Sequence, residues 1–170
     1  MPPERFVLHL SGHACSGKST VADALAERLP GLYVVSYDRL KWQLAGYDRT
    51  KDGPLVDDLV LGFFEVVCRR HIPVLLDFYF ETEAGYTACR AVAEREGYAF
   101  ADVELTAPLP VLLQRFRQRV ADAARTGAKI SVTDEAVFLR NAERVFFLPP
   151  GSPRFDTSTT DIDAIVDGIL

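Results

Sequence analysis

Residues 10–20, LSGHACSGKST, combine small residues, a lysine and hydroxyl side chains in a spacing that suits phosphate binding. Gly12, Gly17, Lys18 and Ser19 fit the pattern G-x-x-x-x-G-K-[ST]. Glycines let successive backbone N–H groups converge on phosphate oxygens, and a following helix adds the positive end of its dipole. The pattern predicts that Lys18 reaches the β- and γ-phosphates of ATP and that the Ser19 hydroxyl coordinates Mg²⁺. The predicted ATP-binding loop is Gly12, His13, Ala14, Cys15, Ser16, Gly17, Lys18, Ser19 and Thr20.

The elements on either side of this loop decide whether the pattern marks a phosphate-binding loop. Residues 5–10, RFVLHL, form an almost continuous apolar run, which is typical of a strand buried on both faces of a parallel sheet. Residues 18–29 follow with the apolar spacing of a helix, and Pro30-Gly31 ends it. The order strand, glycine loop, helix favours a phosphate-binding loop over an ordinary turn with a solvated lysine.

The rest of the chain alternates predicted strands and helices. Three further strands are expected at 32–37, 72–80 and 98–105, and the last part, FDTSTTDIDAIVDGIL, is expected to contain a short strand or loop, an Asp161 cap and a final helix. Helices are expected around 40–44, 55–70, 83–96, 108–125 and 134–146, with a polar connection over 46–54. Alternation of this kind predicts an α/β three-layer sandwich with a mainly parallel five-stranded sheet, as one domain over residues 1–170.

Composition narrows the function classes. The 170 residues are 48% hydrophobic and 25% charged, and the N-terminus MPPERF lacks the apolar stretch of a signal peptide, so a cytosolic protein without a membrane partner is expected. The three widely spaced cysteines predict neither a disulfide framework nor a zinc site. A net charge of −5 argues against indiscriminate binding to nucleic acid. No pattern in the sequence indicates the oligomeric state.

The sequence lacks the signature motifs of several classes of nucleotide-binding protein. A GTPase needs an [NT]-K-x-D segment after a strand, and a transporter-type ATPase needs an L-S-G-G-Q-like motif, and neither is present. A ring-forming ATPase normally carries a helical domain, which this length does not accommodate. The remaining common class is the small phosphoryl-transfer kinase.

Four stretches carry a resemblance to a known group: GHACSGKST, the aspartate of VVSYDRLK, VLLDFYF and the arginine-rich QRFRQR. On these, and over nearly its whole length, the chain resembles the small P-loop kinases grouped with chloramphenicol phosphotransferase, zeta-type toxins and the 5′-kinase domain of polynucleotide kinase. The resemblance implies an ATP- and Mg²⁺-dependent kinase with an alcohol acceptor, and a short helical lid over about 115–133.

Two aspartates follow predicted strands and are candidates for the chemistry. By resemblance, Asp38 accepts the proton of the hydroxyl that is phosphorylated, and the alternative is that it caps a short helix beginning at Arg39. Asp77 ends an apolar strand in the manner of a Walker B aspartate and is predicted to hold Mg²⁺ with Ser19. Its alternative is a buried aspartate bonded to loop amides. Lys18, Ser19 or the metal could compensate its charge.

The arginine-rich segment has a helical spacing that puts Arg115 and Arg119 on one face and Arg117 on another. Resemblance to lid arginines implies that Arg115 or Arg119 closes over the phosphates, which makes both catalytic candidates; a solvated charged face is the alternative. Tyr79 and Phe80 lie just beyond Asp77 and are expected to line the acceptor pocket.

The sequence departs from the polynucleotide kinases at one position. By resemblance, that group has an arginine three residues after the base aspartate, whereas this chain has Lys41, a point charge without the bidentate fork. With Arg39, Lys41 is expected to keep the site entrance basic. The leading hypothesis is therefore a kinase for a small-molecule hydroxyl. The alternatives are a kinase for a nucleic-acid 5′ end or a nucleotide-sugar hydroxyl, and a regulatory nucleotide-binding protein that hydrolyses ATP slowly or not at all.

Overall fold

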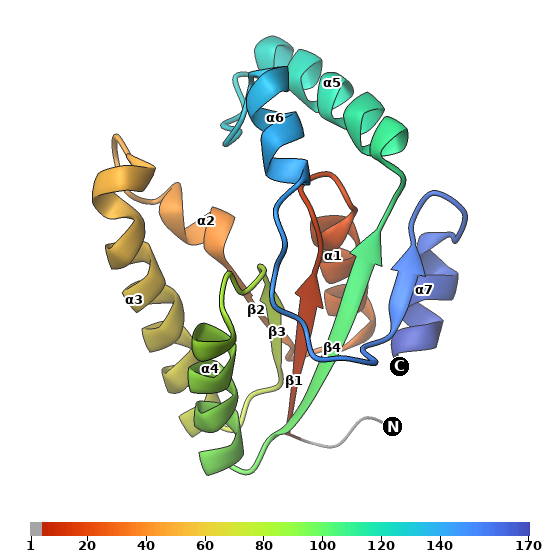
Figure 1. Cartoon of the computed structure of the whole chain (residues 1–170). Helices are drawn as coiled ribbons and strands as arrows, with labels where there is room; N and C mark the ends of the chain where they lie inside the picture. Colours follow the sequence, from red (N-terminus) through yellow and green to blue (C-terminus); the bar gives the residue numbers. More distant parts are fainter. Residues whose placement is uncertain (1–4) are drawn as a thin grey trace.

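Five parallel strands and seven helices follow one another along residues 5–170, which a computed structural model describes (Figure 1). Residues 1–4, the start of MPPERF and of the expected domain, lie outside the described part. The strands are β1 (Phe6–Ser11), β2 (Tyr33–Ser36), β3 (Val74–Asp77), β4 (Ala99–Thr106) and β5 (Arg154–Asp156). The helices are α1 (Lys18–Arg28), α2 (Tyr37–Lys41), α3 (Arg49–Arg69), α4 (Glu83–Arg95), α5 (Leu109–Thr126), α6 (Glu135–Ala142) and α7 (Ile162–Ile169).

The sheet has the order β2-β3-β1-β4-β5, and every neighbouring pair is parallel. One face is covered by α3 and α4, whose buried side chains include Phe64 and Cys89. The other face is covered by α1 and α7, through side chains such as Leu25 and Ile165. These are the three layers that the sequence predicts, and the predicted α/β fold is confirmed.

Register brings the polar strand ends together at the carboxyl edge of the sheet. Asp77, the last residue of β3, pairs with Leu10 of β1 on one side and with Ser36 of β2 on the other. The glycine loop leaves β1 directly after this point. Parallel sheets of this kind bind ligands at the carboxyl ends of their strands, so the edge near Asp77 is where a site is expected.

The expected boundaries around α2 and α3 are wrong. The short helix lies at Tyr37–Lys41 instead of 40–44, and α3 begins at Arg49, inside the stretch expected to be a polar connection. Asp48 explains the early start, because its side chain accepts hydrogen bonds from the backbone N–H groups of Thr50 and Lys51. Pro54 lies inside α3 and does not end it.

Helices α5 and α6 lie together above the carboxyl edge of the sheet (Figure 1). The stacked rings of Phe116 and Phe138, with centroids 4.3 Å apart, belong to a small separate core between them. Helix α6 ends at Ala142, earlier than expected, and the chain then returns to the sheet, where the Phe147 N–H donates to the Phe80 carbonyl over 2.9 Å. The segment that follows α6 is therefore hydrogen-bonded to the chain just beyond the end of β3.

Among residues 5–170, no helix has both the length and the apolar character needed to cross a membrane.

Candidate active site

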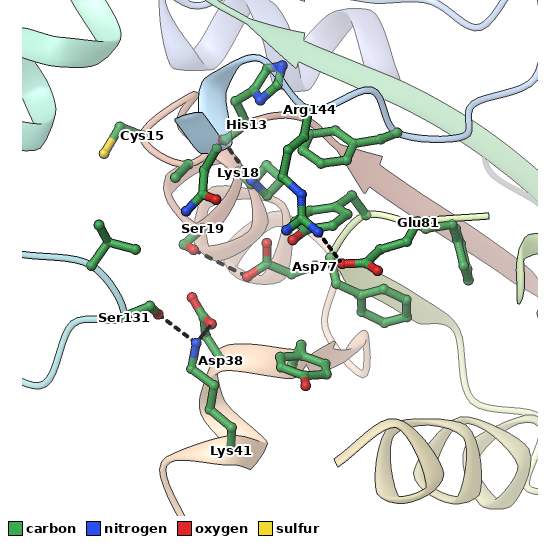
Figure 2. A pocket seen from close by; sticks show the side chains of 18 of the residues that line it. His13, Cys15, Lys18, Ser19, Asp38, Lys41, Asp77, Glu81, Ser131 and Arg144 are labelled. Atoms are coloured by element: carbon green, nitrogen blue, oxygen red, sulfur yellow. Dashed lines mark hydrogen bonds and ion pairs between the residues drawn. The ribbon is translucent and has the colours of Figure 1, made fainter. Parts of the chain in front are cut away.

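A cleft of about 1110 Å³ lies at the carboxyl edge of the sheet. It brings together all six side chains for which the sequence predicts a catalytic or metal-binding role: Lys18, Ser19, Asp38, Asp77, Arg115 and Arg119. Most residues of the predicted ATP-binding loop also line the cleft. The exceptions are Gly12 and Ser16, which are buried. Figure 2 shows four of the six side chains at close range.

Two glycines of the loop have backbone conformations that favour glycine. Gly12 has φ +145°, and a Cβ at this position would lie 2.3 Å from the Leu105 carbonyl oxygen, so no other residue fits without displacing β4. Gly17, with φ +93°, is the N-cap residue of α1. The N-terminus of α1 therefore opens onto the cleft beside Lys18, as anion binding requires.

The Lys18 ammonium group is held inside the loop. Its Nζ donates to the carbonyl oxygens of Gly12 and His13 over 2.7 and 2.9 Å. Burial lowers the pKa of Lys18, and the carboxylates of Asp77 and Asp38 oppose that effect. A cation with so little hydration interacts more strongly with phosphate oxygens than it would in water.

Asp77 is 8% exposed and accepts hydrogen bonds from two hydroxyl groups. Its Oδ2 lies 3.2 Å from Ser19 Oγ and 3.3 Å from Ser36 Oγ. Burial raises the pKa of Asp77, while Lys18 and the Ser19 hydrogen bond lower it. These partners differ from the loop amides of the alternative interpretation, and Ser36 is a partner that the sequence did not predict.

The adjacent Ser19 hydroxyl and Asp77 carboxylate fit a magnesium ion. Both are hard oxygen ligands, and Mg²⁺ in nucleotide sites takes one or two protein oxygens and completes its shell with phosphates and water. Among residues 5–170, no three His, Cys, Asp or Glu side chains converge as an all-protein metal site. Ser19 and Asp77 would hold the ion together with the nucleotide, and this remains a prediction.

Asp38 lies in the first turn of α2, where Ser36 occupies the N-cap position. The Asp38 side chain is therefore not the helix cap of the alternative interpretation. It is 55% exposed, lines the cleft and forms an ion pair with Lys41 (Figure 2).

Lys41 is buried, with a side chain only 7% exposed. Besides Asp38, its Nζ donates to Ser131 Oγ over 2.6 Å, in the loop between α5 and α6. The rings of Tyr37, Trp42 and Tyr47 surround the ammonium group, with centroids within 4.9–5.9 Å. The expectation that Lys41 helps to keep the site entrance basic is wrong, because its charge is already paired and enclosed.

The three arginines of α5 have different environments. Arg115 donates to the Thr157 hydroxyl and carbonyl oxygens over 2.8 Å each, and also to the Cys15 carbonyl, so it fixes the glycine loop to the segment after β5. Arg117 forms an exposed pair with Glu135. Arg119 lines the cleft and makes no hydrogen bond or ion pair with residues 5–170. Of the two predicted lid arginines, Arg119 has the guanidinium group that is available to phosphate.

Arg119→Gln is expected to lower turnover about 10- to 100-fold and to change ATP affinity much less, since the charge it meets develops most fully in the transition state. Steady-state kinetics and calorimetry with an ATP analogue measure the two effects. The matched control is Arg117→Gln on the same helix, which should leave both unchanged. Equal turnover of the two variants would contradict a role for Arg119 at the phosphates.

A second group of charged side chains lines the cleft beyond Asp77, and sequence analysis did not find it. Glu81 accepts from Arg49 over 2.9 Å and pairs with Arg144 over 3.3 Å. Burial, with Glu81 nearby, raises the pKa of Asp57. These residues come from three separate segments, so no local motif signals the cluster. We call them the rim: Arg49, Asp57, Glu81 and Arg144.

Tyr79 and Phe80 both line the cleft, as the sequence predicts for an acceptor pocket. The Tyr79 ring stacks on Phe146 with a centroid distance of 3.9 Å. Phe146 in turn lies 4.7 Å from the His13 ring, so this wall runs from the glycine loop to the rim.

Comparison with known proteins identifies a family. A family model described as AAA domain matches residues 7–145. A search of curated proteins found no match to the chain.

Solved structures of small kinases share the fold. A protein of Chloroflexus aurantiacus described as a candidate kinase has a TM-score of 0.75 at 21% identity, with 98% of this chain and 97% of that chain covered. The Mycobacterium tuberculosis APS kinase, solved in complex with AMPPNP and APS, has a TM-score of 0.69 at 20% identity, with 99% and 96% covered. A gluconokinase of Sinorhizobium meliloti has a TM-score of 0.60 at 22% identity, with 98% and 90% covered. At these identities the likeness shows a common fold, which is the fold predicted from the sequence.

Proposed function

Because the chain belongs to the AAA domain family of P-loop NTPases, we propose that it is an ATP-dependent phosphotransferase that moves the γ-phosphate of ATP to a hydroxyl group of a small-molecule acceptor. One observation carries the proposal: the exposed carboxylate of Asp38 lies in the same cleft as Lys18 and the Ser19–Asp77 pair (Figure 2). A protein that only binds nucleotide does not need such a carboxylate. The fold shared with proteins named as kinases agrees with it.

In the proposed reaction, the Asp38 carboxylate accepts the proton of the acceptor hydroxyl as the oxygen attacks the γ-phosphorus. The new oxygen–phosphorus bond replaces the bond between the γ-phosphorus and the β,γ-bridging oxygen, and ADP leaves with that oxygen. Positioning and charge neutralisation supply most of the rate in reactions of this type. The ion pair with Lys41 fixes the orientation of the Asp38 carboxylate.

The other side chains act on the phosphates. Lys18 and the backbone N–H groups of the loop bind the β- and γ-phosphates. Arg119 stabilises the negative charge on the phosphoryl group that is transferred. Ser19 and Asp77 would hold magnesium, which supplies charge neutralisation between the β- and γ-phosphates when bound. Arg115 acts indirectly, because its hydrogen bonds keep the glycine loop and Thr157 in place.

The buried position of Lys41 gives little support to a nucleic-acid 5′ end as acceptor. A phosphate bound at the entrance would need to draw the Lys41 ammonium away from Asp38, Ser131 and three aromatic rings. Arg39, the other basic residue of the segment, pairs with Asp23 at the surface. A small-molecule acceptor makes no such demand.

An acceptor screen tests the proposal. The protein is incubated with ATP, Mg²⁺ and a panel of sugars, nucleosides, antibiotics and 5′-hydroxyl oligonucleotides, and ADP formation is measured. At least one small molecule is expected to raise the rate well above that with water alone and to be recovered as a phosphomonoester by mass spectrometry. Slow hydrolysis that no acceptor accelerates would favour the regulatory alternative, and transfer to the oligonucleotides alone would favour the nucleic-acid alternative.

A further inference from the structure

The loop between α5 and α6, residues 127–133, contacts α2 at two points, and we call it the lid loop. The Nζ of Lys41 donates to Ser131 Oγ over 2.6 Å. The Nζ of Lys129 lies 6.0 Å from the centroid of the Trp42 ring, directly after α2. Part of the loop also lines the cleft, so these contacts close the cleft on the side of α2.

The lid loop can leave α2 without unfolding of the lid helices. Helices α5 and α6 hold each other through the stacked rings of Phe116 and Phe138 and through the ion pair between Arg117 and Glu135. Ser131 takes part in neither contact, and its side chain is exposed. Its hydrogen bond to α2 can therefore break while the two helices stay packed.

The Lys41 ammonium group joins the lid loop to the proposed base. It has three N–H donors, and it donates to Asp38 Oδ1 and to Ser131 Oγ (Figure 2). A cation that is 7% exposed needs these acceptors, because little water reaches it. A water molecule in the place of the Ser131 hydroxyl would satisfy the donor, but it would not connect Lys41 to the lid loop.

The Asp38 carboxylate is restrained by Lys41. Its Oδ1 accepts from the ammonium group, and among residues 5–170 its Oδ2 makes no hydrogen bond. One oxygen is thus held, and the other is available for the proton of an acceptor hydroxyl. Because the side chain is 55% exposed, its orientation depends on where the Lys41 ammonium group lies.

We propose that Ser131 is a positioning residue for phosphoryl transfer, which acts through Lys41 to hold the Asp38 carboxylate in its reactive orientation while the lid loop lies on α2. The base is then aligned when the cleft is covered. A displacement of about 1 Å can cost on the order of 100-fold in rate, so a loosened Asp38 slows transfer without weakening ATP binding at the glycine loop. This inference rests on the proposed function, and it adds a link between lid and base that the function itself does not require.

Fluorescence tests the contact between the lid loop and α2 without ATP or acceptor. Trp42 is the single tryptophan of the chain, so acrylamide quenching reports on its surroundings. Ser131→Ala is expected to raise the quenching constant, because the loop with Lys129 moves off α2. Ser131→Thr keeps the hydroxyl group and should behave as the wild type. Thr133→Ala is the matched control, since Thr133 is exposed in the same loop and does not line the cleft.

Steady-state kinetics with an acceptor test the positioning role. Ser131→Ala is expected to lower kcat about 10-fold or more while KM for ATP stays unchanged. Ser131→Thr and Thr133→Ala should keep the wild-type kcat. Because Ser131 acts through Lys41, Ser131→Ala should cause no further loss in a Lys41→Met background. Thermal unfolding of every variant separates these effects from loss of the fold.

Unchanged quenching in Ser131→Ala would show that Ser131 does not hold the lid loop, and it would overturn the inference. A folded Ser131→Ala protein with the wild-type kcat would overturn it too, as would an equal further loss in the Lys41→Met background. Failure of the proposed function looks different. In that case the wild type itself transfers phosphate to no acceptor, which removes the role of Ser131 along with the kinase.

Discussion

Asp38→Asn is expected to slow phosphoryl transfer by about 10²- to 10⁴-fold, the usual effect of removing a general base. The amide keeps the shape of the side chain and cannot accept the proton. Because Asp38 is 55% exposed and its hydrogen-bond partner is Lys41, not the glycine loop, affinity for an ATP analogue should change little. Single-turnover kinetics measure the transfer step, and calorimetry measures nucleotide binding.

Asp23→Asn is the control for lost ion pairing. Asp23 also pairs with a basic residue of α2, Arg39, but it is exposed and does not line the cleft. The control should retain full activity. Asp38→Asn also deprives the buried Lys41 of its carboxylate, so thermal unfolding is measured for both variants. A folded Asp38→Asn protein that transfers phosphate at the normal rate would place the base elsewhere, with Asp77 the next residue to test.

Lys18→Met is expected to lower turnover by about 10²- to 10³-fold, the scale found when a preorganised donor to developing charge is removed. It should also weaken binding of a Mg²⁺–ATP analogue, because methionine retains the apolar stem and removes the cation. The hydrogen bonds from Lys18 to Gly12 and His13 are lost as well, which loosens the loop. Calorimetry and steady-state kinetics measure both effects.

Lys51→Met on α3 provides the comparison, since Lys51 is exposed and does not line the cleft. It should bind the ATP analogue normally. If a folded Lys18→Met protein bound the analogue as tightly as the wild type, the assignment of the phosphate-binding loop would be wrong.

The parts that sequence analysis predicted well are those in which neighbours in the chain are neighbours in space. Strand, glycine loop and helix follow one another over residues 6–28, so the spacing of residue types was sufficient to predict these three elements. The start of α3 was missed because Gly53 and Pro54 suggested a break, whereas the Asp48 cap stabilises the first turn and the helix continues through both residues.

The contacts that could not be predicted join distant segments. Lys41 was expected to keep the site entrance basic, because the sequence gives no sign of its partner Ser131, which lies 90 residues further along the chain. Arg115 was grouped with Arg119, although its hydrogen bonds to Thr157 depend on how α5 lies against the end of β5. The rim was missed for the same reason, because Arg49, Glu81 and Arg144 meet only when the chain is folded.

The order of elements also bears on how such proteins diverge. Most of the cleft wall beyond Asp77 comes from one uninterrupted stretch, residues 53–89, while the glycine loop and the α5 arginines lie on either side of it in the chain. Within that stretch, only Asp77 is predicted to act on the phosphates, through Mg²⁺. If the proposed function holds, exchanging the segments on the two sides of β3 would replace most of the walls beyond Asp77 and leave the glycine loop and the α5 arginines unchanged. We therefore expect chimeras that exchange residues 53–89, with Asp77 retained, to change the acceptor preference while they still bind ATP.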